Sequence, residues 1–170
     1  MMKLERFKKN KLPVNWATIL IGWNGPGKFT RILTGQEIIE YALELIESDS
    51  NVLEEVWLLV GCNKNDTEEI QDLLVKLASV ECNEANEVLK WQIVLLQDEL
   101  EKIDKRPLYG LLQLTEFWDK FNYPSDSPHI VQGMNNEVSP EEYYTKENFD
   151  NLIRAQNEWV EKKLEFLVRL

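Results

Sequence analysis

Two pairs of carboxylates have a spacing that could hold a metal ion. Glu37 and Glu40 are three residues apart, and so are Glu69 and Asp72. On a helix, residues three apart share one face, so each pair would present its oxygens together. Carboxylate oxygens are the ligands that Mg²⁺ prefers, and a bound Mg²⁺ can activate water for attack on a phosphate. These four residues are therefore the candidate metal ligands of the sequence.

The same spacing resembles the ExxE and ExxD motifs of all-helical nucleoside triphosphate pyrophosphatases. The resemblance implies a magnesium-dependent enzyme whose two acidic helices face each other. Solvated helix faces are the simpler interpretation, because 30 acids among 170 residues produce such pairs by chance. A further apolar helix is also expected between the pairs, at residues 52–61, and Glu37 and Glu69 are placed to cap helices. We keep the pyrophosphatase as the enzymatic alternative, and we expect no catalytic residue, resident metal or cofactor.

Residues 22–28 come close to a phosphate-binding loop of the form GxxxxGK[ST]. The match fails at Phe29, which replaces the Ser or Thr that holds magnesium. Pro26 also removes a backbone N–H of the kind that cradles phosphate. Residues 63–66 read like the guanine-selecting NKxD motif, but no DxxG lies between the two stretches, so we expect no nucleotide switch. The loop residues whose role stays unassigned are Trp23, Asn24, Gly25, Gly27 and Lys28.

Residues 122–138 are a long stretch without a periodic pattern. The stretch is rich in Asn, Pro, Ser, Asp and Gly, which predicts a loop, and loops of this length are usually functional or disordered. Aromatic residues beside acids suit a protein interface. His129 has no nucleophile near it in the sequence, so we expect it to pack and not to catalyse. The partner-binding candidates are Trp118, Phe121, Tyr123, Asp126 and His129.

The elements that position these residues are expected to be helices. Residues 85–103 carry apolar side chains at spacings of three and four, with further apolar residues beside them, which predicts a helix enclosed by others. We predict an all-α, single-domain bundle of about seven helices around this central helix. The alternative is an α/β or α+β fold with short buried strands at 17–21 and 56–60, where the apolar runs are too short for periodicity to decide. The residues of the central stripe are Ala85, Leu89, Ile93, Leu96, Leu100 and Ile103.

Start signals support several of the other helices. Thr34 with Glu37, and Asp66 with Glu69, have the spacing of a capping box. Thr145 is placed to cap the last helix. The sequence therefore predicts helices that begin directly after each of these three caps.

Charge is distributed unevenly along the chain. The formal net charge is −11, yet residues 1–12 carry five basic side chains and one acid, so the remainder has 14 basic and 29 acidic residues. We expect a basic N-terminal arm at 1–13 and one helical domain at 14–170 that includes the loop at 122–138. An acidic domain disfavours nucleic acid, whose phosphates need Lys and Arg. It suits a basic protein partner, because opposite fields steer encounter.

Cysteine, histidine and targeting signals are few. Cys62 and Cys82 form no CxxC, and His129 is the sole histidine, so a zinc site is not expected. The apolar run 16–23 is too short to span a membrane and is followed by no obvious cleavage site. We expect a cytoplasmic protein with two free, buried thiols and no membrane association. The sequence leaves the oligomeric state open.

Residues 12–18, 22–28 and 38–42 read LPVNWAT, GWNGPGK and IIEYA. These stretches resemble a small bacterial family of uncharacterised proteins, described only as a domain of unknown function. The resemblance implies no catalytic residues. Small, acidic, cytoplasmic families of this sort are similar to the immunity proteins of bacterial toxin systems. We therefore expect a non-catalytic binding protein that inhibits a toxin, such as a basic nuclease, by stoichiometric binding through an acidic surface. A structural or assembly subunit is the further alternative to the pyrophosphatase.

Overall fold

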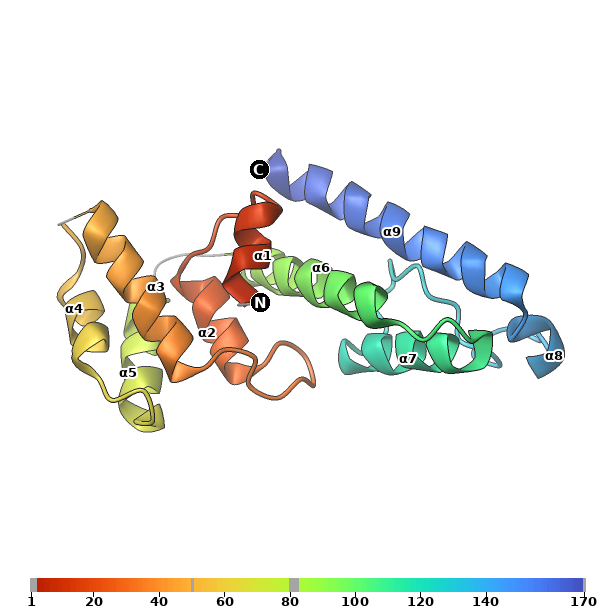
Figure 1. Ribbon diagram of the computed structural model, residues 1–170, viewed down its shortest axis with the longest axis horizontal. Coiled ribbons are helices and arrows are strands. Elements are labelled where there is room, and N and C mark those ends of the chain that lie inside the picture. The colour runs from red at the N-terminus through yellow and green to blue at the C-terminus, as the bar shows by residue number, and fades with distance from the viewer. Residues whose placement is uncertain (1–2, 50, 80–82, 170) are drawn as a thin grey trace. The chain divides into compact units, whose positions relative to one another are not determined.

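The computed structural model describes residues 3–49, 51–79 and 83–169 (Figure 1). Within these ranges every regular element is a helix, and there is no strand. The predicted all-α class is therefore confirmed. The alternative with strands at 17–21 and 56–60 is wrong, because both stretches lie inside helices.

Nine helices are present in the described part of the chain, two more than expected. One helix lies in the predicted arm, where none was expected, and a helix of four residues follows the long loop. The helices are α1 (Lys3–Lys9), α2 (Trp16–Asn24), α3 (Gly35–Ser48), α4 (Glu54–Gly61), α5 (Thr67–Leu77), α6 (Glu84–Lys102), α7 (Pro107–Lys120), α8 (Pro140–Tyr143) and α9 (Lys146–Val168).

The chain forms two compact units, Met1–Trp91 and Gln92–Leu170, and the boundary between them falls within α6. We call them unit 1 and unit 2. In unit 1, α4 packs against α3 and α5, and α2 packs against α5. Each helix turns an apolar face inward, and Ile38, Leu59 and Ile70 are completely shielded from solvent. Burial of side chains of this size stabilises a fold by roughly 1.5–3 kcal/mol each.

Helix α1 contributes to the core of unit 1. Leu4 and Phe7 are buried, and the ring of Phe7 meets Trp91 edge-on with centroids 4.8 Å apart. Edge-to-face contacts of this kind are favourable because the positive ring edge meets the negative face. Residues 3–9 are therefore helical and packed, while the division into an arm and one domain stays a prediction.

The predicted caps are confirmed. The Thr34 hydroxyl accepts a hydrogen bond from the N–H of Glu37 at 3.2 Å, and the Glu37 carboxylate accepts from the N–H of Thr34 at 2.9 Å. Asp66 accepts from the N–H of Glu69 at 3.2 Å, and the side chain of Thr145 caps α9 in the same way. Each such cap stabilises a helix start by about 1 kcal/mol, so the sequence places these three starts correctly.

Helix α6 matches the predicted central helix to within one residue at each end. Its middle is closed to solvent, with Trp91, Ile93 and Leu96 all fully buried. Among the described residues, no helix is both long enough and apolar enough to cross a membrane. The burial of Trp91, Ile93 and Leu96 accounts for the apolar character of the middle of α6.

Unit 2 is organised around Trp118 of α7. The indole is fully buried, and its N–H donates to Oε1 of Gln156 on α9 at 2.8 Å. Trp159, one helical turn further along α9, meets the same indole edge-on with centroids 5.2 Å apart. The hydrogen bond to Gln156 and the ring contact with Trp159 both connect α7 to α9 through Trp118.

The stretch 122–138 lacks any helix or strand, as predicted. It is nevertheless held in place by hydroxyl groups. Tyr143 donates to the carbonyl of Ile130 at 2.5 Å, and Tyr123 donates to the carbonyl of Thr115 at 3.2 Å. The loop is thus a packed part of unit 2.

Candidate functional site

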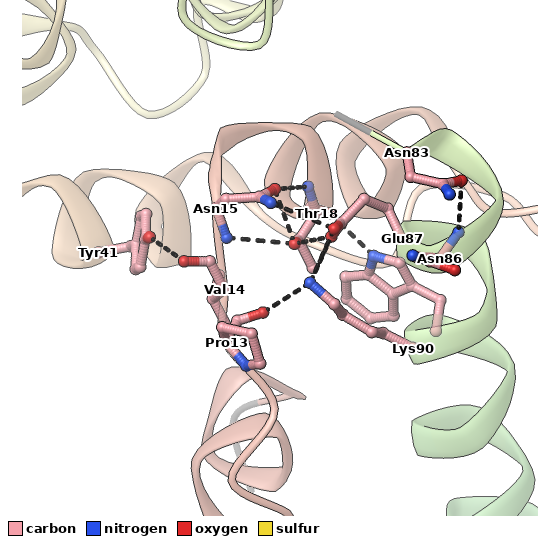
Figure 2. Close-up of polar contacts among 10 residues, drawn as sticks. Pro13, Val14, Asn15, Thr18, Tyr41, Asn83, Asn86, Glu87 and Lys90 are labelled. Carbon is pink, nitrogen blue, oxygen red and sulfur yellow. Dashed lines mark hydrogen bonds and ion pairs between the residues drawn. The ribbon is translucent and has the colours of Figure 1, made fainter. Parts of the chain in front are cut away.

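Two charged side chains of α6 are buried where this helix faces the segment that leads into α2 (Figure 2). Glu87 is 5% exposed and Lys90 is 4% exposed. The Lys90 ammonium lies 2.8 Å from one carboxylate oxygen of Glu87. Removing two charges from water is costly unless each is paired and hydrogen-bonded. The surrounding segment must therefore supply further partners.

Those partners come from the residues before and at the start of α2 (Figure 2). Asn15 Nδ2 donates to Glu87 Oε1 at 3.1 Å, and the Thr18 hydroxyl donates to Glu87 Oε2. Lys90 Nζ donates to the carbonyl of Pro13 at 2.9 Å. Asn15 is also the N-cap of α2, since its Oδ1 accepts from the N–H of Thr18 at 2.8 Å. The cap that starts α2 and the ion pair on α6 thus share residues.

The arrangement leaves the ion pair no bonding capacity for a substrate. Lys90 Nζ donates to both carboxylate oxygens and to the Pro13 carbonyl, which uses its three hydrogens. Each oxygen of Glu87 accepts from Lys90 and from one group of the α2 segment. The cluster is structural, because it fixes the first half of α6 to α2.

Trp91 extends this connection toward the end of α2. Its indole N–H donates to the carbonyl of Thr18 at 2.8 Å, and its ring lies over Gly22. A Cβ at Gly22 would come within 2.2 Å of that ring and 2.9 Å of Leu33. Glycine is therefore required at this position, and the contact sets the place of Trp23, the next residue.

A pocket of about 520 Å³ opens beside Trp23. It forms where the segment after α2 and the starts of α3 and α5 come together. Gly35 permits this approach, because a Cβ there would lie 2.1 Å from the carbonyl oxygen of Lys64. The lining residues are Trp23, Arg31, Ile32, Leu33, Thr34, Gly35, Gln36, Lys64, Asn65 and Thr67.

The pocket has a positive character in an acidic protein. Arg31 and Lys64 line it, and no acid does. The Arg31 guanidinium lies 3.4 Å from the centre of the Trp23 ring, a cation–π contact. Within the described chain, neither cation forms an ion pair. We call this feature the cationic pocket.

A second pocket in unit 1 has a volume of about 260 Å³, and its one cation is balanced by an acid. Lys8 lies there and pairs with Glu44 at 2.8 Å. Tyr41 donates to the carbonyl of Val14 at 3.0 Å, and burial raises the pKa of this tyrosine to about 12. The phenol is therefore neither an acid nor a base near neutral pH, and the cationic pocket is the better candidate site.

The structure separates the residues of the loop that resembles a phosphate-binding loop. Of the five unassigned residues, Trp23 lines the cationic pocket, whereas Asn24, Gly27 and Lys28 are exposed. Gly25 has φ +93°, and a Cβ there would lie 2.1 Å from the carbonyl oxygen of Phe29. The backbone conformation of the turn and the close approach of Phe29 thus require glycine at position 25. Lys64 and Asn65, from the stretch that reads like NKxD, line the same pocket as Trp23.

The four carboxylates of the enzymatic alternative do not form a metal group. Among the described residues, no three His, Cys, Asp or Glu side chains converge in a way that could hold a metal ion. Glu37 caps α3, and Glu40 accepts from the side chain of Gln36 at 3.0 Å. Glu69 and Asp72 are exposed on α5. The geometry therefore gives the pyrophosphatase reading no support.

The five partner-binding candidates fall into two groups. Trp118, Phe121 and His129 are buried, whereas Tyr123 is half-buried and Asp126 is exposed. The three buried side chains pack unit 2 and are not presented to a partner. Asp126 forms an ion pair with Lys163 of α9.

His129 stays neutral inside unit 2. Its Nε2 lies 2.8 Å from the Thr115 hydroxyl, which itself donates to the carbonyl of Leu111 at 2.9 Å. The hydroxyl hydrogen is thus committed, so Nε2 carries the proton and donates to Thr115. Burial lowers the pKa of His129 to about 4, which removes it as a base or switch at neutral pH.

Cys62, at the end of α4, is a free thiol as expected, but it is partly exposed, so the expectation that it is buried is wrong. Burial, together with the nearby Glu69 carboxylate, raises the pKa of the thiol to about 11. Because the thiolate is the nucleophile, this side chain is unreactive near neutral pH. Cys82 lies outside the described residues.

The helices α3, α4 and α5 present apolar side chains among acids. Residues 35–79 contain eleven acids and two basic residues, and none of the eleven acids is buried. Every large exposed apolar side chain in the described part of unit 1 also lies in this range. We call these side chains and the acids around them the acidic surface; its apolar members are Leu43, Leu53, Trp57, Leu58 and Val75.

Sequence reasoning missed both the buried ion pair and the exposure of Trp57. A signal for the ion pair existed, since Glu87 and Lys90 share one helical face with Trp91 and Val94. No local signal distinguishes Trp57 from Trp118, which is buried. The first feature was visible in the spacing, and the second depends on the tertiary packing.

A family model described as "Uncharacterized protein conserved in bacteria (DUF2247)" matches residues 4–164. No curated protein and no solved structure matches the chain. The match spans both units and nearly the whole sequence, and it confirms the resemblance that the sequence suggested. The chain belongs to the DUF2247 family of bacterial proteins.

Proposed function

We propose that this protein is a non-catalytic binding protein that inhibits a basic protein partner through the acidic surface of α3, α4 and α5. The observation that carries the proposal is the coincidence of two features in residues 35–79. All the large exposed apolar side chains of described unit 1 lie there, and so do eleven acids against two basic residues. An immunity protein that blocks a bacterial toxin domain is the form of this function that we favour.

Trp57 is the expected anchor of the interface. It is 51% exposed on α4, while Val56 and Leu59 of the same helix are buried against the rest of unit 1. Tryptophan is among the residues that most often dominate binding energy at protein interfaces. Leu53 and Leu58 are also exposed nearby on the chain, so a partner would cover an apolar group and not a single ring.

The acids around these residues would steer and select the partner. Complementary charge raises the association rate and disfavours partners of the same sign. The loop 122–138 and the end of α7 are the weaker location for an interface, because three of the five candidate residues there are buried. The proposed interface therefore lies on unit 1.

A calorimetric titration tests the proposal. The purified full chain is titrated with each protein encoded by a gene next to its own, at about 50 mM and about 500 mM NaCl. We expect one basic protein to bind with one-to-one stoichiometry and with an affinity that falls at least tenfold at high salt, because exposed charges are screened. The same protein should lose its toxic activity in the complex. Absence of binding by every neighbour, or binding without inhibition, would overturn the proposal.

A structural or assembly subunit predicts a different result. It requires that the apolar part of the acidic surface be covered by another copy of the chain. Sedimentation of the chain alone separates the two functions, since an inhibitor of a partner leaves this surface free and a subunit forms a stable oligomer.

A further inference from the structure

We infer that the cationic pocket of unit 1 binds a small molecule that carries a phosphate monoester group. The group would sit between Arg31 and Lys64, with the uncharged remainder of the molecule against Ile32 and Leu33. This inference concerns a separate feature of unit 1 and does not depend on the proposed protein partner.

Charge is the first argument. Arg31 and Lys64 are both exposed at the pocket, and neither is neutralised by an acid within the described chain. Two cationic residues that line one cavity without a neutralising acid favour an anion there. Residues 35–79 supply five of the lining residues and also contain eleven acids. None of these acids lines the pocket.

Unused backbone donors are the second argument. The pocket is lined by the first residues of α3 and by those at the start of α5. No hydrogen bond joins the backbone N–H of Gly35, Gln36 or Thr67 to another described residue. Gly35 itself is buried and lines the pocket. First-turn N–H groups aligned with a helix dipole are common ligands of phosphate oxygens.

A buried side-chain donor is the third argument, and it is independent of the helix ends. Trp23 is 1% exposed, and its indole N–H has no hydrogen-bond partner in the described structure. The same residue lines the cationic pocket beneath the Arg31 guanidinium. Buried indole N–H groups usually find an acceptor. An oxygen of an anion bound beside Arg31 would provide one.

Pocket size and lining define the class of ligand. A volume of about 520 Å³ lies within the range of small-molecule sites. Ile32 and Leu33 give the pocket an apolar wall, which suits an ester better than a bare ion. Arg31 and Lys64 match the two negative charges of a phosphate monoester, so a monoester is the better fit.

Isothermal titration of the full chain tests the inference. Glycerol 3-phosphate is the probe, glycerol is its uncharged control, and the buffer contains no phosphate and about 50 mM NaCl. We expect one-to-one binding of the ester and none of glycerol. Arg31→Ala and Lys64→Ala should each weaken binding by about tenfold or more, because each removes a charge-assisted hydrogen bond.

Lys28→Ala is the matched control, since Lys28 is an exposed cation of the same segment that does not line the pocket. It should change the affinity by less than about twofold. Equal weakening by all three variants would show general charge attraction and would overturn the site. Inorganic phosphate should bind more weakly than the ester, and equal binding would overturn the assignment of an ester as the ligand.

The indole N–H signal of Trp23 gives a second readout in a nitrogen–proton NMR spectrum. Trp23→Phe assigns the signal by its loss, and through-bond assignment replaces that variant if it does not fold. The signal should move as glycerol 3-phosphate is added. An unmoved signal, together with the absence of heat at about 10 mM ester, would contradict the inference.

Discussion

The two units bury different kinds of polar groups. Unit 1 encloses the charged pair Glu87 and Lys90, and both members have partners on every side. Unit 2 encloses only neutral groups among its described residues. Buried nitrogens without a partner occur in both units, at Trp23 in unit 1 and at His129, Gln156 and Trp159 in unit 2. Since an uncompensated charge costs far more than an unpaired neutral donor, unit 1 has less tolerance for the loss of one contact.

The surfaces of the units differ as well. In unit 1 the cationic pocket and the acidic surface have opposite charge, and both are formed by helices of the same unit. In unit 2 the exposed large apolar side chains are spread over α7, the long loop and α9. Recognition needs side chains held on rigid elements. The proposed protein interface therefore lies on unit 1, where exposed apolar side chains and acids occur together on α3, α4 and α5.

The largest expected effect is on the buried ion pair. Glu87→Gln keeps the shape of the side chain but leaves the Lys90 ammonium buried without its counter-charge. Breaking a buried pair in this way costs roughly 3–5 kcal/mol in the free energy of unfolding. Denaturant unfolding, with hydrogen exchange of the α2 amides as the local probe, measures the loss. A loss of less than about 1 kcal/mol would show that the ion pair does not stabilise the contact between α2 and α6.

The double variant Glu87→Leu/Lys90→Met is the control for this prediction. It removes both charges, and replacement of a buried pair by apolar groups of similar volume is often nearly neutral. We therefore expect it to be more stable than Glu87→Gln alone. A double variant as unstable as the single one would point to packing and not to charge.

The second prediction concerns unit 2 and pH. Burial lowers the pKa of His129 to about 4, whereas an unfolded histidine titrates near pH 6.5. Between these values the unfolded chain binds a proton that the folded chain does not. The contribution of His129 to the free energy of unfolding is therefore fully present above about pH 6.5. It is lost as the pH falls toward 4, by about 3 kcal/mol in all.

Comparison with His129→Gln isolates this effect, because the carboxylates titrate in both proteins. The amide of glutamine can still donate to Thr115 but gains no charge. Unfolding measured at pH 7 and at pH 4.5 should show a smaller drop for His129→Gln than for the natural chain. An equal drop in the two proteins would contradict the assignment of a neutral, buried imidazole.

A smaller effect is expected at the neutral contact of unit 2. Gln156→Leu leaves the N–H of Trp118 without its acceptor, and an unsatisfied buried donor costs roughly 1–3 kcal/mol. The variant also removes the unpaired Nε2 of Gln156, so the loss should fall in the lower half of that range. The free energy of unfolding is measured for Gln156→Leu and for Gln156→Glu, which keeps an acceptor oxygen for Trp118. A loss for Gln156→Leu as large as that for Glu87→Gln would break the contrast between the units.

Local sequence patterns were sufficient for most of the helices. The stripe from Ala85 to Ile103 predicts α6 because its period is sustained over five turns, and Thr34 and Asp66 mark starts that the structure confirms. The short apolar runs at 17–21 and 56–60 could not be assigned, since five residues show no reliable period.

The candidate site could not be predicted in the same way. Asn15 and Glu87 are 72 residues apart in the chain, yet they share a hydrogen bond. The cationic pocket likewise depends on the approach of Lys64 to Gly35, which no local pattern encodes. Composition shows how many tryptophans the chain has, but only packing decides that Trp118 is enclosed and Trp57 is exposed.

The affinity of the Trp57→Ala variant for the neighbouring-gene partner tests the central claim most directly. Phe166→Ala is the matched control, because Phe166 of α9 is 49% exposed and Trp57 is 51% exposed. Loss of an anchor tryptophan should weaken binding by about 30-fold or more, while the control stays within about twofold. Neither variant should change the free energy of unfolding by more than about 0.5 kcal/mol. If Phe166→Ala weakens binding as much as Trp57→Ala, or if neither does, the placement of the interface on unit 1 is contradicted.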